Sequence, residues 1–327
     1  MTEPHRLWDA INRGPIRPSS RIHIRRGSSR GHGHTMMQIK SAKDRIVTIK
    51  ESQIEIGSHT FDVRTSGDEG ELVVLLHGFP ETSHMWIPLL EHLGANGYRA
   101  IAPDLRGYSR GARPEGAENY SYPVMADDVL GIAEALGSDR FHLVGHDHGA
   151  GLGWFVVGNH ANRIASWSAL SVPHIDAFGN AIANNPEQSE RSQYILFFQQ
   201  EGAAEKMLSD NDYAGLKAVW NQSSPEQIEE YLRVFQQPGA LTGALNWYRG
   251  MTVVGEERQP IGEVAVPTIL IWGNQDQAIG RPGVDATPPL MTGPYRLIEL
   301  DVGHWLIQEA QPEVLSEISE HPKAFPV

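Results

Sequence analysis

The sequence contains no cysteine among its 327 residues. Disulfides, thiol catalysis and Cys-based zinc or iron–sulfur sites are therefore excluded. It also lacks an apolar run near the roughly 18–20 residues that a membrane span needs. A net charge of −13 argues against nucleic acid as a partner. Hydrophobic residues make up 40% and charged residues 20% of the chain, proportions typical of a globular protein.

Positive charge is concentrated at the start of the chain. Residues 1–34 hold seven arginines, no lysine and two acidic residues, a net charge of +5 that leaves −18 on the rest. They show no helical or strand periodicity, and we interpret them as a disordered basic tail. They also lack the apolar segment of a secretory signal, and we expect a cytoplasmic protein. Two alternatives stay open: a transit peptide, or translation that starts at Met36 or Met37.

From about residue 46 the pattern is that of an α/β protein. Continuous apolar runs such as 71–76 favour strands buried on both faces, as in a parallel sheet. These runs alternate with helical patterns, which indicates a doubly wound sheet. The predicted strands are 46–50, 53–57 and 60–64, all antiparallel, and then 71–76, 99–102, 140–144, 164–172, 268–272 and 295–300. The predicted helices that flank them are 83–95, 122–136, 149–159 and 305–320.

Strand patterns stop between residues 173 and 263, where the sequence predicts several helices. Patterns typical of strands return at 268–272. We therefore predict an α/β core domain made of residues 46–172 and 264–327. The helical segment 173–263 would be a cap domain inserted between two of its strands.

The segment 141–150, FHLVGHDHGA, predicts a nucleophile on a tight turn between a strand and a helix. Gly145 and Gly149 permit a strained turn that lifts the central side chain above the sheet. That central residue is Asp147. The alternative interpretation is an ordinary capping aspartate that follows a strand.

The partners of a triad follow in the order acid, then histidine. Strand 268–272 leads into Asp276 and strand 295–300 leads into His304, so both are expected at the carboxyl edge of the sheet. His304 would act as general base, and Asp276 would fix its tautomer. Asp176 and Asp301 are weaker candidates for the acid. A loop histidine and a turn-forming aspartate are the alternatives.

Two backbone N–H groups are predicted to bind an oxyanion. HGFP at 77–80 follows a buried strand and supplies the N–H of Phe79. His148, directly after the nucleophile, supplies the second.

Two competing sites are disfavoured. GYSRG at 107–111 matches G-x-S-x-G, but Ser109 lies four or more residues beyond its strand and precedes a loop instead of a helix. The triplet HDH could suggest metal ligands. His146 and His148 flank a turn, however, and would point away from each other, so we predict no metal site.

The chain from about residue 46 resembles the α/β-hydrolase superfamily, specifically its epoxide hydrolase branch. The motifs that carry the resemblance are HGFP (77–80), DLRGYSRG (104–111), GHDHG (145–149), WGNQD (272–276) and GHW (303–305). It implies a mostly parallel, eight-stranded sheet with an inserted helical cap, and no cofactor.

The resemblance also implies two tyrosines that descend from the cap. The segments YILFFQ and LNWYR are similar to those that carry them, which points to Tyr194 and Tyr248. Two phenols could protonate the epoxide oxygen as it becomes an alkoxide. The alternative is that both are core residues of helices. Trp86 and Trp305 are further candidates for the substrate pocket.

The implied activity is hydrolysis of a small-molecule epoxide by water to a vicinal diol, through an ester on Asp147. Dehalogenases that use the same aspartate are one alternative. Haloalkane dehalogenases usually have Trp where His148 stands, and fluoroacetate dehalogenases have arginines at the positions of His148 and Leu152. Many epoxide hydrolases also carry Trp at the His148 position. The second alternative is a non-catalytic ligand-binding protein, which would need no base–acid pair.

Overall fold

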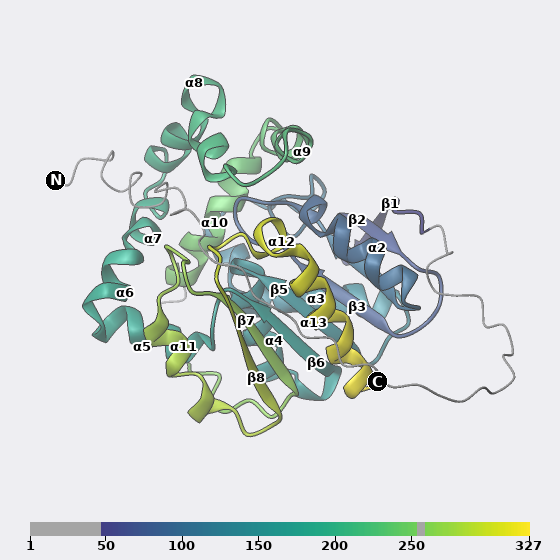
Figure 1. Cartoon of the computed structure of the whole chain (residues 1–327). Helices are drawn as coiled ribbons and strands as arrows, with labels where there is room; N and C mark the ends of the chain where they lie inside the picture. Colours follow the sequence, from purple (N-terminus) through teal and green to yellow (C-terminus); the bar gives the residue numbers. More distant parts are fainter. Residues whose placement is uncertain (1–46, 254–258) are drawn as a thin grey trace, which may run out of the picture.

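The computed structural model describes residues 47–253 and 259–327. Its centre is one eight-stranded sheet with the strand order β1-β2-β4-β3-β5-β6-β7-β8 (Figure 1). The pairs β1–β2 and β2–β4 are antiparallel, and all other neighbours are parallel. The strands are β1 Lys50–Ile56, β2 His59–Ser66, β3 Leu72–Leu76, β4 Arg99–Pro103, β5 Phe141–His146, β6 Ile164–Leu170, β7 Thr268–Gly273 and β8 Tyr295–Leu300. This sheet confirms the predicted α/β fold class.

The central strands explain why the sequence shows continuous apolar runs. β3, β5, β6 and β7 are buried at every position, because helices cover both faces of the sheet. Helix α3 packs on α4, and α2 packs on α13. The helices that flank the sheet are α2 Ile87–Ala95, α3 Tyr122–Ala135, α4 His148–Asn159, α11 Arg281–Asp285, α12 Leu306–Glu309 and α13 Gln311–Ala324.

The predicted strand at 46–50 is wrong. Residues 47–49 form no regular structure, and residue 46 lies outside the described residues. Instead, β1 is one strand that pairs with β2 across a two-residue turn in which Gly57 has a φ of 58°. Glu51 and Ser52 separate the predicted strands 46–50 and 53–57. In the structure they belong to β1, an edge strand whose first four residues are exposed. Polar side chains there stay in water and do not interrupt the strand.

The predicted helix at 305–320 is divided in two. α12 ends at Glu309, and α13 starts at Gln311 with Pro312 in its first turn. Proline is tolerated in the first turn because that turn needs no backbone N–H donor, so it begins a new helix. The predicted helix at 83–95 likewise starts as a 3-10 turn, Ser83–Trp86, before α2.

Between β6 and β7 the described residues form six helices, which Figure 1 shows grouped at the left and top of the core. They are α5 Ile175–Asn184, α6 Pro186–Arg191, α7 Gln193–Phe198, α8 Ala203–Val219, α9 Pro225–Phe235 and α10 Ala240–Val253. This is the segment for which the sequence predicts a cap, and the division into domains stays a prediction. The predicted tail, 1–34, lies outside the described residues.

Buried hydrogen bonds attach these helices to the loops that follow β3 and β4. The Trp220 indole N–H donates to the carbonyl oxygen of Pro80 at 3.1 Å. The Trp247 indole N–H donates to the carbonyl oxygen of Arg106 at 2.7 Å. These bonds therefore hold the segment between β6 and β7 against the two loops that follow the carboxyl ends of β3 and β4.

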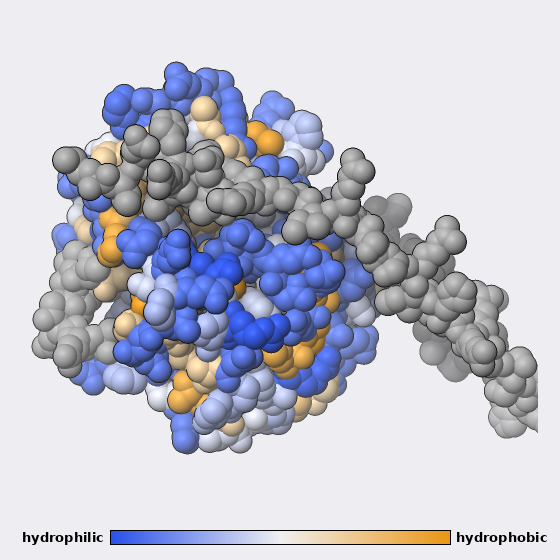
Figure 2. All heavy atoms as spheres, turned by 60° about the vertical axis from the view of Figure 1, so that its left-hand side comes forward, coloured by the Kyte–Doolittle hydropathy of each residue, from blue (hydrophilic) through white to orange (hydrophobic). Residues whose placement is uncertain are grey.

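The surface seen in Figure 2 is largely hydrophilic, with small apolar patches between charged side chains. Among the described residues the large hydrophobic side chains that are exposed are Leu196, Met251, Leu297 and Val327. No helix in the described part of the chain has both the length and the apolar character needed to cross a bilayer.

We expect the ion pair between Arg106 and Asp128 to be a main stabilising contact of the loop after β4. Asp128 accepts two hydrogen bonds of 2.7 Å from Arg106, and each side chain is only 6% exposed. Asp128→Asn should lower the free energy of unfolding by about 3–5 kcal/mol, because it leaves a buried charge without its partner. Chemical denaturation measures the change. Glu320→Gln, which breaks an exposed pair with Lys323, is the control and should change stability by less than about 1 kcal/mol. Equal effects of the two variants would contradict this assignment.

Candidate active site

Asp147 lies on a strained turn between β5 and α4. Its φ of 51° and ψ of −121° are unfavourable for a residue with a side chain. At three glycines around this turn, the neighbouring atoms leave no space for a side chain. A Cβ atom at Gly145 would lie 2.4 Å from the carbonyl oxygen of Gly149, and one at Gly149 would lie 2.2 Å from that of Leu76. A Cβ at Gly78 would lie 2.4 Å from that of Asp147. The glycines therefore allow the turn to press its side chain against the loop after β3.

Three side chains from separate strand ends form a line. His304 Nε2 lies 3.4 Å from Asp147 Oδ2, and His304 Nδ1 lies 2.8 Å from Asp276 Oδ2. The side chains of Asp147 and His304 are 10% and 13% exposed, and that of Asp276 is fully buried. Asp276 follows β7 and His304 follows β8, so neighbouring parallel strands bring them to one edge. The structure thus brings together the three residues for which the sequence predicts a triad.

Asp276 is held by donors that the sequence analysis did not identify. The Ser171 hydroxyl donates to Asp276 Oδ2 at 2.9 Å and lies 3.0 Å from His304 Nδ1. The backbone N–H groups of Ala278 and Ile279 donate to Asp276 Oδ1 at 2.8 and 2.9 Å. Ser171 has a φ of 69° at the end of β6. A positive φ at a serine cannot be predicted from the sequence, because only the tertiary contacts impose it.

The loop that bears His304 is fixed by a second carboxylate. Glu309 accepts hydrogen bonds from the N–H groups of Gly303 at 2.9 Å and Trp305 at 3.0 Å. His146 Nε2 donates to the carbonyl oxygen of His304 at 2.9 Å. The imidazole is therefore anchored through its own backbone as well as through its ring.

The three charges shift one another's pKa values in a consistent direction. Burial alone would lower the pKa of His304, but Asp276 and Asp147 raise it well above its usual value. Burial alone would raise the pKa of Asp147, but the hydrogen bond with His304 and the charge of that imidazolium hold it well below its usual value. The pKa of Asp276 is lowered against burial by His304 and the two backbone donors. The favoured state is an imidazolium between two carboxylates.

The two predicted oxyanion donors both lie beside Asp147. The Phe79 N–H donates to Asp147 Oδ1 at 2.9 Å. His148 is the first residue of α4, where a backbone N–H has no acceptor within the helix. Asp147 Oδ1 is therefore the carboxylate oxygen that accepts from the Phe79 N–H, and Oδ2 is the oxygen that faces His304.

Tyr194 and Tyr248 lie on α7 and α10, with ring centroids 6.2 Å apart. Burial and then the charge of Asp147 raise the pKa of both phenols well above the usual value. Neither hydroxyl has a hydrogen-bond partner among the described residues, and neither is among the fully buried atoms that lack one. Phe198 packs 5.1 Å from the Tyr248 ring. Both hydroxyls are thus protonated, unpartnered among the described residues and not fully buried, and the charge of Asp147 acts on both.

The two tryptophan candidates are in different surroundings. The Trp305 ring lies 4.8 Å from that of His304, at an angle of 90°. Trp86 is fully buried, and in the described part of the chain it makes no ring contact or hydrogen bond with the other candidates.

The competing candidates have partners elsewhere. The hydroxyl of Ser109 is buried and donates to the carbonyl oxygen of Asp104. Asp176 accepts from the Gly262 N–H, and Asp301 accepts from the side chain of Gln275. The described residues contain no group of three or more His, Asp or Glu side chains arranged to hold a metal ion.

Glu81 is a buried carboxylate that the sequence analysis missed. It is 0% exposed, and its Oε1 accepts hydrogen bonds from Tyr231 and Gln308. Its Oε2 has no partner and lies 3.7 Å from Nδ1 of His146, which also has none. Burial raises the pKa of Glu81 to about 7, and burial lowers the pKa of His146 to about 4. Glu81 therefore ionises only near neutral pH, and the ring of His146 lies 4.8 Å from that of His304.

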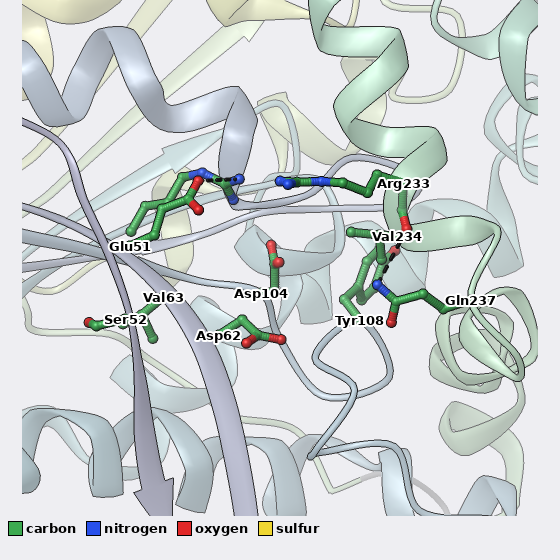
Figure 3. Close-up of a pocket in the computed structure, with 10 residues that line it drawn as sticks. Glu51, Ser52, Asp62, Val63, Asp104, Tyr108, Arg233, Val234 and Gln237 are labelled. Atoms are coloured by element: carbon green, nitrogen blue, oxygen red, sulfur yellow. Dashed lines mark hydrogen bonds and ion pairs between the residues drawn. The ribbon is translucent and has the colours of Figure 1, made fainter.

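A separate cavity of about 270 Å³ lies between the antiparallel strands and α9. Figure 3 shows Glu51 on one side and Tyr108, Val234 and Arg233 on the other. Arg64 lines it as well and pairs with Glu51 at 3.0 Å. None of the residues predicted to react or to bind an oxyanion lines this cavity.

The comparisons with known proteins cover the region that carries the site. The model of the α/β-hydrolase fold family matches residues 71–310, which include every candidate residue named above. The AB hydrolase superfamily protein YfhM of Bacillus subtilis is 31% identical, over 79% of this chain and 92% of the relative. Epoxide hydrolase A of Mycobacterium tuberculosis is 31% identical, over 78% of this chain and 91% of the relative. The crystal structure of epoxide hydrolase VrEH1 from Vigna radiata matches with a TM-score of 0.75 and 26% identity, over 85% of this chain and 98% of that one.

We expect Glu81 to make stability depend on pH. Its pKa in the folded state, about 7, lies above the value of 4.5 for a free glutamate. Folding therefore favours the protonated form, and stability that is fully present below pH 4.5 is lost as the pH rises to 7 and beyond. Glu81→Gln mimics the protonated acid, so it should remove this loss. Its melting temperature relative to the wild type should rise between pH 5 and pH 8. A difference that is constant over this range would contradict the assignment.

Proposed function

This chain belongs to the α/β-hydrolase fold family, and we propose that it hydrolyses small-molecule epoxides to vicinal diols through an ester on Asp147. One observation carries the proposal. A buried carboxylate with a depressed pKa lies 3.4 Å from the imidazole of an imidazole–carboxylate pair, and its charge acts on two buried phenols whose hydroxyls have no partner among the described residues. Relatives named as epoxide hydrolases at 31–32% identity support the same assignment.

The first step would open the ring. Asp147 Oδ2 attacks a ring carbon while Phe79 holds Oδ1, and the electrons of the breaking C–O bond pass to the ring oxygen. Tyr194 or Tyr248 gives that oxygen a proton. The depressed pKa of Asp147 keeps the nucleophile ionised, and the raised pKa values of the phenols keep the donors protonated. The products of this step are an ester of Asp147 and a tyrosinate.

The second step would hydrolyse the ester. Esterification removes the negative charge of Asp147, one of the causes that raise the pKa of His304. The imidazolium can then pass its proton to the tyrosinate and act as general base toward water, while Asp276 stabilises the cation that forms again. The N–H groups of Phe79 and His148 would hold the oxyanion. The proton taken from water restores the imidazolium and hydrolysis frees the Asp147 carboxylate, so the balance is one epoxide and one water to one diol.

The phenols distinguish this reaction from dehalogenation. A leaving halide needs hydrogen-bond donors but no proton, whereas an alkoxide must be protonated. Two hydroxyls held in the protonated form near Asp147 therefore favour an epoxide. An imidazole with Asp276 behind it would have no use in a protein that only binds a ligand.

We predict that Tyr194→Phe and Tyr248→Phe each slow ring opening by about 10²–10³, the usual loss for one preorganised donor. The double variant should be far slower than either single one, because each phenol can partly replace the other. Single-turnover rates on a panel of epoxides measure the effect. Near-normal epoxide turnover by the double variant would show that both tyrosines are packing residues.

We predict that His304→Gln separates the two steps. Ring opening does not need the base, whereas ester hydrolysis should slow by about 10²–10⁴. The variant should accumulate an adduct with the mass of enzyme plus epoxide, which peptide mass spectrometry assigns to Asp147. His304→Gln combined with Asp147→Asn is the matched control and should give no adduct. An adduct on Ser109, or none on Asp147 despite measurable substrate binding, would contradict the mechanism.

A further inference from the structure

His148 carries an imidazole that has no hydrogen-bond partner among the described residues. Its ring lies edge to face against Tyr248, with centroids 4.2 Å apart, and 5.5 Å from the ring of Trp247. The residue directly follows Asp147 at the start of α4. The residue that follows Asp147 therefore packs its imidazole against helix α10.

The nitrogens of this imidazole are not fully buried. Fully buried nitrogens without a partner occur in the described histidines only at His84 and His146. The nitrogens of His148 also lack partners, so they keep accessible surface although the residue is only 8% exposed. The hydroxyls of Tyr194 and Tyr248 have the same property, and the charge of Asp147 acts on all three side chains. Three side chains with unpartnered polar atoms thus lie close enough to Asp147 for its charge to shift their pKa values.

The charge state of the ring limits what it can bind. Burial lowers the pKa of His148 against the opposing effect of Asp147, so the ring is neutral at neutral pH. A neutral imidazole offers one donor and one acceptor. It cannot offset the repulsion between Asp147 and an anionic substituent. An apolar substituent would displace water from the nitrogens without replacing the lost hydrogen bonds. An uncharged hydroxyl, which both donates and accepts, is the matching group.

We propose that His148 determines specificity for epoxides that carry a hydroxyl on the carbon next to the ring, the 2,3-epoxy alcohols. This inference rests on the proposed epoxide hydrolysis and narrows its substrate class. The hydroxyl of the substrate bonds to the imidazole while Asp147 attacks a ring carbon and Tyr248 donates to the ring oxygen. The side chain of His148 binds substrate and takes no part in breaking the C–O bond.

Two isosteric substrates test the proposal. Glycidol and 1,2-epoxybutane differ only in a hydroxyl that replaces a methyl group. His148→Phe should lower the ratio of their kcat/KM values, glycidol over 1,2-epoxybutane, by about tenfold, the effect of one lost hydrogen bond. His148→Asn and His148→Gln should restore part of the ratio, because an amide supplies a donor and an acceptor near Nδ1 or Nε2 respectively.

Phe198→Leu is the matched control. The Phe198 ring lies 5.1 Å from that of Tyr248 and has no polar atom. The substitution should therefore affect both substrates alike and leave the ratio of their kcat/KM values the same. A displaced Tyr248 in the His148 variants would likewise slow both substrates equally. If His148→Phe still hydrolyses both epoxides and the ratio of their kcat/KM values is unchanged, this inference is wrong but the proposed function stands.

The wild type separates this inference from the proposed function. If it opens other epoxides of a panel but not glycidol, the inference is wrong and the proposed function stands. If it opens no epoxide at all, the proposed function is wrong and the inference falls with it.

Discussion

The charge of Asp147 is the constraint on which the rest of the site depends. This carboxylate is almost sealed from water and lies at a positive φ, two conditions that raise its free energy. Three features offset them: the Phe79 N–H, the N-terminus of α4 and the imidazole of His304. A neutral side chain would need none of these features. Their combination around the Asp147 carboxylate therefore supports its proposed role as a nucleophile.

Two buried carboxylates of this site have pKa values shifted in opposite directions, and their surroundings explain the difference. Asp147 faces an imidazolium and a backbone donor, so it stays ionised. Glu81 faces a neutral His146, and its donors are the side chains of Tyr231 and Gln308, so burial dominates. The charges that raise the pKa of His304 are those of Asp276 and Asp147. His304 therefore responds mainly to Asp147 and Asp276, and the loss of one of those charges would change its pKa.

The site has two sides with different physical character. The strand ends supply the charged groups, held by backbone donors and by Ser171. Helices α7 and α10 supply two phenols packed among aromatic rings. These neutral side chains add no charge near the carboxylate. His148 belongs to the first side by sequence and contacts the second through Tyr248. Substrate selection is therefore expected at the boundary between the two sides.

The sequence by itself determined the parallel strands and the turn that carries Asp147, because burial on both faces and glycine spacing are encoded by neighbouring residues. It also predicted the order of Asp276 and His304. It misplaced the first strand, since exposed polar residues on an edge strand look like a loop. It did not reveal Ser171 or Glu81. Their roles depend on a positive φ, complete burial and partners from distant elements, such as Tyr231 and Gln308. Only tertiary packing decides those properties, because it alone determines which polar groups lose water and which partners replace it.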